Sequence, residues 1–476
     1  MIKQLWATKN PRDSHGAADA LGLRRALGPW GLTALGIGAV IGGGIFVITG
    51  KAAAEHAGPA IMLSFVLAAI CCGFCALAYA EFAAMVPVSG SAYSYTYATM
   101  GELAAWFIGW MLVLEYGVSG SAVAVSWTGY FLSFLEHSGI HLPAQLVSSP
   151  LDAKLKPTGA IANLPAAAIV VLMTAVCYAG IRKSSAVNVA MVVLKTALIL
   201  LVIFVGWRYV DPGNWQPFIP ANEAPGKYGW EGVLRGASMV FFAYIGFEAV
   251  SVAAQESVKP QKDMPISMIL SLLICTLLYV GMAAVMTGLV SYRLLGTDEP
   301  VVTAVAAHPD LGWLRIVVEI GALIGLSSVV LVIVLAQPRI FMIIAHDGLL
   351  PPVFARIHPR YRTPHINTVI TGISLALLAA FFPLDILGEL TSMGTLIAFA
   401  SVCIGVLVLR RTRPDLPRPF RMPAAPLICL AGACGCILLL STMTAHNWML
   451  MGIWTAAGLA IYVFYGYRHS KLRRRQ

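Results

Sequence analysis

Charged side chains are scarce in this sequence. Only 11% of its 476 residues are Asp, Glu, Lys or Arg, whereas a soluble globular domain has about 25%. Hydrophobic residues make up 58% of the chain. So few charges cannot cover the surface of a folded chain of this size, so we expect lipid to cover it. The composition excludes a soluble globular protein and predicts an integral membrane protein.

Long polar segments are also lacking. The longest stretches outside apolar runs are the first 28 residues and the loops around 136–160, 210–228 and 346–366. None can hold a soluble catalytic domain, and nothing at the N-terminus is typical of a cleavable signal peptide. We therefore expect the protein to act within its apolar part.

Cysteine is present, but its spacing predicts no metal centre. All nine cysteines lie in apolar runs, and the closest spaced pair, Cys434 and Cys436, has no histidine nearby. Free buried thiols are the expected state. No run has the spacing of a nucleophile with a base or of a set of metal ligands. The sequence therefore predicts neither an enzyme nor a resident cofactor or metal.

Twelve apolar runs are long enough to cross about 30 Å of hydrocarbon as helices. This predicts an all-α integral membrane protein with twelve transmembrane helices. The runs are 29–50, 59–87, 103–135, 161–181, 187–209, 229–256, 264–290, 313–345, 367–383, 388–409, 424–443 and 447–467.

The basic residues predict the orientation of these spans. With the N-terminus inside, the inside segments hold 23 of the 32 Lys and Arg residues and the outside segments hold 6. This asymmetry is typical of a cell (inner) membrane protein with both termini in the cytoplasm. It explains the net charge of +10 without nucleic acid, and the basic tail 468–476 is suited to lipid headgroups.

Glycine interrupts the first span. The stretch "GIGAVIGGGIFVITG", residues 36–50, has six glycines, and each costs a helix about 1 kcal/mol relative to alanine. The sixth span is also interrupted, around 242–246. Five spans separate the two breaks, so the sixth span runs opposite to the first. Paired breaks of this kind predict two inverted repeats with a binding site between them.

The expected organisation follows from this pairing. It comprises a cytoplasmic segment 1–28, a first repeat 29–209 (spans 1–5), a second repeat 229–409 (spans 6–10), two further spans over 424–467 and the basic tail 468–476.

A broken helix offers backbone groups to a ligand. Free amides at the start of a half-helix suit a carboxylate, and free carbonyls at the end of the preceding half suit an ammonium. An α-amino acid carries both groups on one carbon. The alternative is close helix packing, because Gly38 and Gly42 also form a GxxxG pair.

Three stretches resemble the amino acid–polyamine–organocation superfamily, and most of all its bacterial cationic-amino-acid-transporter-like branch. They are "GIGAVIGGGIFVITG", "FFAYIGFEAVSVAAQE" and "AQPRIFMIIAHDGLLPPVFARIHPRYRTPHINT". The resemblance implies a LeuT-like five-plus-five inverted repeat with discontinuous helices 1 and 6 and two extra helices. It also implies secondary transport of amino acids, usually with protons.

The resemblance implies a substrate site at the two breaks. The carboxylate would meet the amides of Gly43, Gly44 and Ile45. The ammonium would meet the carbonyls of Val40, Phe242 and Ile245. Phe242 resembles an aromatic lid, Ala243 belongs to the same break and Leu326 is a candidate wall of the pocket. The family often has Ser or Thr where this chain has Gly43, so the carboxylate would lack that hydroxyl.

The resemblance also implies a coupling site at Lys195, deep in the fifth span. Its ammonium would join the carbonyls of Gly38 and Ile41 to the hydroxyls of Ser327 and Ser328, and would release and regain a proton during transport. The alternative is a lysine that reaches the membrane surface.

Buried acidic residues are further candidates, since charge within a membrane is costly. Glu115 could pair a substrate cation, relay a proton or be structural. Glu81 is expected to be structural or part of a gate, whereas the roles of Glu248 and Glu319 are left open.

The leading hypothesis is a proton-coupled importer of neutral α-amino acids that works by alternating access, with spans 1, 2, 6 and 7 rocking against spans 3, 4, 8 and 9. The expected coupling ion is the proton, and the expected partners are the substrate and lipid. The alternatives are an amino acid or polyamine exchanger, cationic amino acid uptake, and an amino acid sensor without transport.

Overall fold

The computed structural model describes residue 8 and the ranges 27–85, 91–178, 184–252, 257–358 and 364–474. Residues 1–7, 9–26 and 475–476, which belong to the predicted cytoplasmic segment and basic tail, lie outside the described residues. Within the described ranges the chain is helical, and its only β-type pairs are isolated bridges. The prediction of an all-helical chain is thus confirmed for this part.

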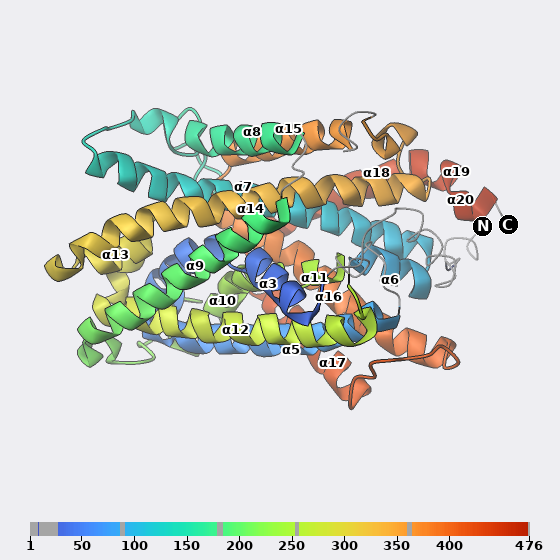
Figure 1. Cartoon of the computed structure of the whole chain (residues 1–476), viewed down its shortest axis with the longest axis horizontal. Helices are drawn as coiled ribbons and strands as arrows, with labels where there is room; N and C mark the ends of the chain where they lie inside the picture. The colour runs from blue at the N-terminus through green and yellow to red at the C-terminus, as the bar shows by residue number, and fades with distance from the viewer. Residues whose placement is uncertain are drawn as a thin grey trace.

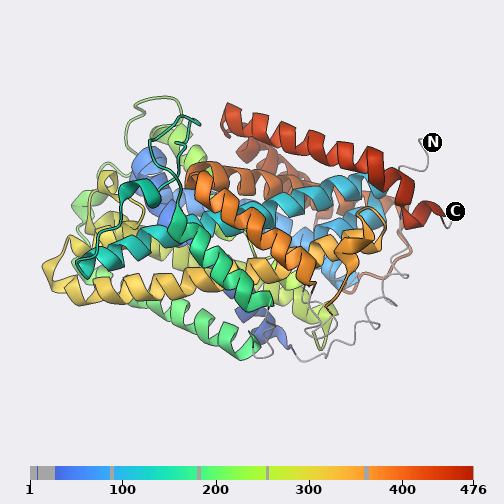
Figure 2. The same ribbon diagram turned by 90° about the horizontal axis from the view of Figure 1, so that it is seen from above.

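The helices form an elongated bundle (Figures 1 and 2). Its main helices are α3 (Pro29–Val40), α5 (Ile61–Met85), α6 (Ser91–Thr99), α7 (Glu102–His137), α8 (Leu164–Tyr178), α9 (Ser184–Gly206), α10 (Gly229–Val240), α12 (Pro260–Leu289), α13 (Pro300–Ala306), α14 (Gly312–His346), α15 (His365–Phe381), α16 (Leu384–Thr412), α17 (Ala425–Ser441) and α18 (Ala445–Ile461). The short segments η1 (Gly44–Ile48), α4 (Thr49–Ala52), η2 (Ala53–Ala57), η7 (Phe241–Tyr244), α11 (Ala249–Val252), α19 (Tyr467–His469) and α20 (Lys471–Arg474) complete it.

The long helices run the length of the molecule in two packed pairs. α7 lies against α14, and α5 lies against α12, with α3 and α10 packed beside them (Figure 1). One end of the bundle carries α13, and the other end carries α19 and α20 (Figure 1). We call them the α13 end and the α20 end.

The apolar surface of the outer helices is suited to lipid. Large side chains such as Phe204 and Leu427 are 75% and 71% exposed. Among the described residues, seven helical stretches are long and apolar enough to cross a membrane, and four more apolar helices are shorter. The chain is therefore a multi-pass membrane protein, whereas the exact count of twelve crossings stays a prediction.

Both expected interruptions are present. α3 ends at Val40, and helical structure resumes at η1 after the extended residue Ile41. α10 passes into the single 3-10 turn η7, and α11 begins only at Ala249. These two breaks lie in the middle of the bundle, and we call them the first and second break.

Candidate functional site

The first break exposes the start of a half-helix. Ile41 has φ −72° and ψ 102°, which ends α3, and Gly43 precedes η1 with helical angles. The amides of Gly43, Gly44 and Ile45 therefore begin a new helical segment, where no preceding turn supplies them with carbonyl partners. This is the backbone arrangement that favours a carboxylate.

The second break is built around Gly246. Its φ of +120° lies in a region that only glycine adopts without strain. A Cβ here would lie 2.8 Å from the carbonyl carbon and oxygen of Ala39, so the backbone of the second break touches the end of α3. The Gly246 amide donates to the side-chain carboxylate of Glu248 at 3.0 Å.

The two breaks face each other directly. A Cβ on Gly44 would lie 2.4 Å from the Cα of Ala243, so only glycine permits this approach. Tyr279 of α12 ties the breaks together, because its hydroxyl lies 3.0 Å from the carbonyl oxygen of Val40 and 2.9 Å from that of Ala243. Sequence reasoning missed Tyr279, since no local pattern marks it.

Two of the three predicted ammonium acceptors already have partners within the protein. The Val40 carbonyl accepts from Tyr279, and the Phe242 carbonyl accepts the Ile245 amide at 3.3 Å. A carbonyl oxygen has two lone pairs, so each can accept a second donor. Phe242 and Leu326 are buried, and their roles as lid and wall stay predictions.

A serine on α7 lies beside Gly43. The hydroxyl oxygen of Ser126 lies 2.7 Å from the point where a Cβ on Gly43 would be. This hydroxyl now donates to the Ala122 carbonyl at 3.0 Å within its own helix. Position 43 lacks a hydroxyl, but the neighbouring helix thus places one beside it, and sequence spacing alone could not reveal it.

Lys195 reaches the end of α3 from α9. Its fully buried ammonium donates to the carbonyls of Gly38 and Ile41 at 2.5 and 2.8 Å. These are the two carbonyls that the resemblance implied. They belong to the last turn of α3 and its C-cap, where the helix dipole also favours a positive charge. The side chain points into the bundle, not toward the membrane surface.

The two serines that the resemblance implied as partners of Lys195 donate their hydroxyls within their own helix. Ser327 donates to the Leu323 carbonyl at 2.7 Å, and Ser328 donates to that of Gly325 at 2.6 Å. Serine hydroxyls in helices commonly bond to the preceding turn of the same helix. α14 still packs against the lysine, since a Cβ on Gly325 would lie 3.4 Å from the Lys195 Cβ.

Glu115 and Glu248 form a buried acidic pair between α7 and the second break. Both side chains are 1% exposed, and the Glu248 carboxylate is the main charged neighbour of Glu115. Both oxygens of Glu115 and one of Glu248 lack a hydrogen-bond partner. Buried polar groups are normally satisfied, so this pair is an unusual feature of the interior.

Comparisons with known proteins identify the family of the chain. A family model described as "Amino acid permease" matches residues 27–462. The chain belongs to the amino acid permease family. Within the amino acid–polyamine–organocation superfamily this is a family of transporters and not of enzymes.

Relatives of this permease carry different substrate names. It is 46% identical to the branched-chain amino acid permease BcaP of Bacillus subtilis (strain 168) and 43% identical to the methylthioribose transporter of the same organism, in each case over 95% of both chains. It is also 37% identical to the vacuolar cationic amino acid transporter 4 of Arabidopsis thaliana, over 83% of this chain and 64% of that protein.

Other buried acids of the permease have structural partners. Glu81 of α5 pairs with Arg410 of α16 at 2.5 Å and lies 3.6 Å from Arg418. Glu319 of α14 accepts from Arg315 at 3.0 Å and from Ser133 of α7 at 2.7 Å. These contacts join helices away from the breaks.

Each broken helix has one half at the α13 end, and we call these two halves the outer half-helices. An ion pair holds each of them. Arg235 of α10 pairs with Glu389 of α16, and Lys51 of α4 pairs with Asp298 at 2.9 Å. A small cavity lies between these halves, and its lining includes Ile48, Met239 and Glu389. The permease thus has one ion pair for each outer half-helix.

Proposed function

We propose that this permease imports neutral α-amino acids by proton-coupled alternating access. The observation that carries the proposal is the contact between the two breaks, where Gly44 lies against Ala243 and Tyr279 bridges Val40 and Ala243. Free amides on one side and carbonyls on the other form a main-chain site for one carbon that carries both an ammonium and a carboxylate.

The Ser126 hydroxyl completes the carboxylate site in this proposal. It lies where a side chain at Gly43 would begin, and one rotation about its Cα–Cβ bond redirects it from the Ala122 carbonyl toward a ligand. A hydrogen bond from a hydroxyl to a carboxylate is charge-assisted and stronger than the neutral bond that it replaces.

Apolar groups around the first break favour a neutral side chain. A Cβ on Gly42 would meet Val329 at 3.5 Å and Val123 at 3.9 Å. The name of the Bacillus subtilis branched-chain amino acid permease supports leucine, valine or isoleucine, and alanine is small enough for the same site. Glu115 keeps cationic amino acids as the alternative within the family.

Lys195 is the proposed coupling group. It joins α9 to the last carbonyls of α3, and those carbonyls belong to the span that forms the substrate site. Loss of its proton would release the end of α3, and binding of a proton would tie it again. In this way the charge of one side chain controls the position of the first break. The Glu115 and Glu248 pair, which can share one proton, is the next candidate relay.

The proposed topology assigns the α20 end to the cytoplasm of a cell (inner) membrane protein. It treats residues 29–209 and 229–409 as inverted repeats, with α3, α5, α10 and α12 in the moving unit. An amino acid exchanger on the same fold would need no proton gradient.

Uptake into proteoliposomes tests this function. Wild-type protein should accumulate labelled leucine when the lumen is alkaline and lose accumulation when the gradient is collapsed. Lys195→Ala should lose accumulation, and Lys195→Arg should lose it too, because a guanidinium stays charged. Lys154→Ala, which changes an exposed loop lysine, is the matched control.

Two results would contradict the proposal. Unchanged accumulation in Lys195→Ala, with the pH dependence of wild type, would move the coupling to Glu115. Leucine counterflow without any response to the pH gradient would instead establish the exchanger.

A further inference from the structure

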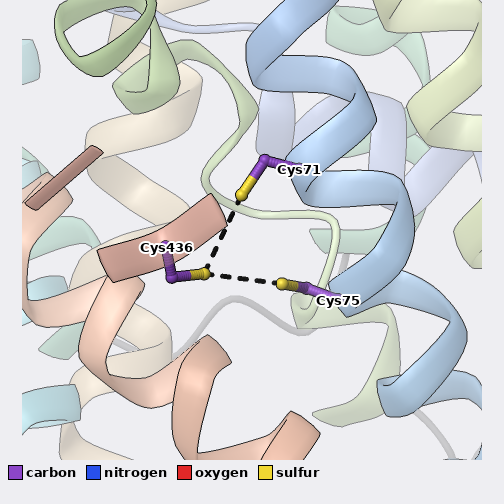
Figure 3. A group of neighbouring side chains, drawn as sticks. All are labelled: Cys71, Cys75 and Cys436. Atoms are coloured by element: carbon purple, nitrogen blue, oxygen red, sulfur yellow. Dashed lines mark hydrogen bonds between the residues drawn. The ribbon is translucent and has the colours of Figure 1, made fainter. Parts of the chain in front are cut away.

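Three cysteines from distant parts of the chain meet in the interior. Cys71 and Cys75 lie one turn apart on α5, and Cys436 lies on α17 (Figure 3). The Cys436 sulfur lies 3.9 Å from that of Cys71 and 3.6 Å from that of Cys75. We call these three residues the thiol triad. All three side chains are buried.

Sequence spacing could not predict this triad, because Cys436 follows Cys75 by 361 residues. The expectation of free thiols holds, since all nine cysteines are free, but Cys434 is exposed and the other eight are buried. The expectation that no metal-ligand set exists was drawn from linear spacing alone. The fold brings together sulfurs that the sequence separates.

The triad has the dimensions of a metal site. Its three sulfurs lie within 4.8 Å of one another. A metal bound at ~2.3 Å from each sulfur separates them by about 3.8 to 4.0 Å. A disulfide instead needs ~2.05 Å between sulfurs, so the thiols would have to move to form one.

Glycines on α17 make room for these sulfurs. A Cβ on Gly435 would lie 3.0 Å from the Cys71 sulfur, and a Cβ on Gly432 would lie 3.5 Å from the Cys75 sulfur. A side chain at Gly435 would press on the Cys71 sulfur, whereas one at Gly432 would press on the Cys403 sulfur, 3.0 Å away, and only touch that of Cys75. The close approach of α17 to α5 therefore depends on the absence of side chains beside the triad.

We propose that the thiol triad binds one monovalent soft cation, copper(I). Thiolate and thiol donors prefer soft ions. Structural zinc sites take four ligands, whereas the described residues offer a group of three, without histidine or carboxylate. Cys403 lies 3.8 Å from Cys75 but outside that group.

Charge also favours a monovalent ion. The surroundings are apolar, so the complex must carry little net charge. Copper(I) displaces one thiol proton to solvent, and the resulting thiolate neutralises it, while the other two sulfurs bind as neutral donors. A bound ion would connect α5 to α17, so under the proposed rocking motion it would slow transport.

Copper retention tests the site. Reduced protein in detergent, kept free of oxygen, is equilibrated with copper(I) buffered by a chromogenic chelator and then desalted. We expect one copper per chain in wild type and in the controls Cys434→Ser and Cys177→Ser. Cys436→Ser and Cys75→Ser should retain none.

X-ray absorption of the wild-type complex keeps the test independent of how the variants fold. It should show only sulfur neighbours around copper. Nitrogen or oxygen neighbours, no retention by wild type, or full retention by Cys436→Ser would each overturn the proposal. Loss of two hydrogens per chain without bound copper would also overturn it, because the thiols would then form a disulfide.

The effect on transport is a separate measurement. Copper(I) at the concentration that fills the site should slow leucine uptake by wild type and leave Cys436→Ser unaffected. Binding without inhibition would leave the site in place and contradict only the proposed motion of α5 relative to α17.

Discussion

The two breaks interrupt their helices with different residues and different hydrogen-bond partners. The first has three successive glycines, Gly42 to Gly44. The carbonyls at the end of α3, just before these glycines, accept hydrogen bonds from Lys195 of another helix. The second has one glycine at positive φ, Gly246, whose amide is capped by Glu248 two residues later. The first break therefore depends on distant helices, whereas the second caps itself locally.

This difference assigns a role to each break. The amides that open η1 remain available to a carboxylate, since their own helix gives them no carbonyl. The Gly246 amide is occupied by a carboxylate of the protein itself, so the second break offers carbonyls and the Phe242 ring. Under the proposed function, the first break would bind the carboxylate, and the second break holds the geometry in which Gly44 meets Ala243.

The largest expected effect distinguishes the ion pairs of the two outer half-helices. The Arg235–Glu389 pair is buried, with side chains 12% and 10% exposed, whereas Asp298 of the Lys51 pair is 68% exposed. Glu389→Gln should lower the free energy of unfolding by about 3 to 5 kcal/mol, because it removes the charged partner of a largely buried arginine, which keeps only neutral acceptors such as the Thr442 carbonyl. Asp298→Asn should cost less than about 1 kcal/mol.

Unfolding in mixed micelles measures both losses. Equal losses of unfolding free energy in the two variants would mean that burial does not determine the strength of these two ion pairs.

The next effect compares one glycine from each break. Gly246→Ala should cost about 1 to 3 kcal/mol for its positive φ, and more because a Cβ would press on the Ala39 backbone. Gly42→Ala is the control, since its Cβ would meet the Val329 and Val123 side chains at ordinary distances of 3.5 and 3.9 Å. Thermal unfolding of both variants checks the difference, and a stable Gly246→Ala would contradict the assigned geometry.

A smaller effect tests the carboxylate end of the first break. Ser126→Ala should weaken leucine binding about tenfold, as expected for loss of one hydrogen bond to a charged group. Adding Gly43→Ser to that variant should restore binding, because the new hydroxyl starts where the old one lay. Calorimetric affinities of wild type, both single variants and the double variant measure the rescue. Unchanged binding in Ser126→Ala would remove this residue from the site.

The smallest effect is a pH dependence beside the first outer half-helix. Glu299 begins α13, whose Pro300 packs against Gly50. Burial, followed by the charges of Asp298 and Glu136, raises the pKa of Glu299 from 4.5 to about 7, against the opposing effect of Arg315 and Lys51. The folded state therefore binds this proton more tightly than the unfolded state, so its stabilisation is lost as pH rises from about 4.5 to 7.

Glu299→Gln should remove that loss, so its melting temperature should fall less than that of wild type across this window. Glu223→Gln is a control of opposite sign, because hydrogen bonds from Lys227 and Arg293 lower the pKa of Glu223. Identical slopes in wild type and Glu299→Gln would place the pH dependence elsewhere.

The sequence predicted elements better than contacts. Hydropathy alone gave the run 103–135 for α7 (Glu102–His137) and 313–345 for α14 (Gly312–His346), since long apolar helices have a strong local signal. Glycine composition located the first break, and comparison of the sixth span with the first located the second. Tyr279, Ser126 and the thiol triad act across helices that are far apart in sequence, so no local pattern could reveal them. Sequence also could not predict that Ser327 and Ser328 donate to carbonyls of their own helix, so their contact with Lys195 stays a prediction.

Ligand competition tests the central claim, that backbone groups at the two breaks recognise a free α-ammonium and a free α-carboxylate. Purified permease should bind L-leucine, whereas leucinamide, N-acetyl-leucine and methylthioribose, which each lack at least one of these groups, should not compete even at a hundredfold excess. Competition by leucinamide or methylthioribose at concentrations similar to leucine would contradict the account, because neither offers the carboxylate that the amides of Gly43 and Gly44 are proposed to hold.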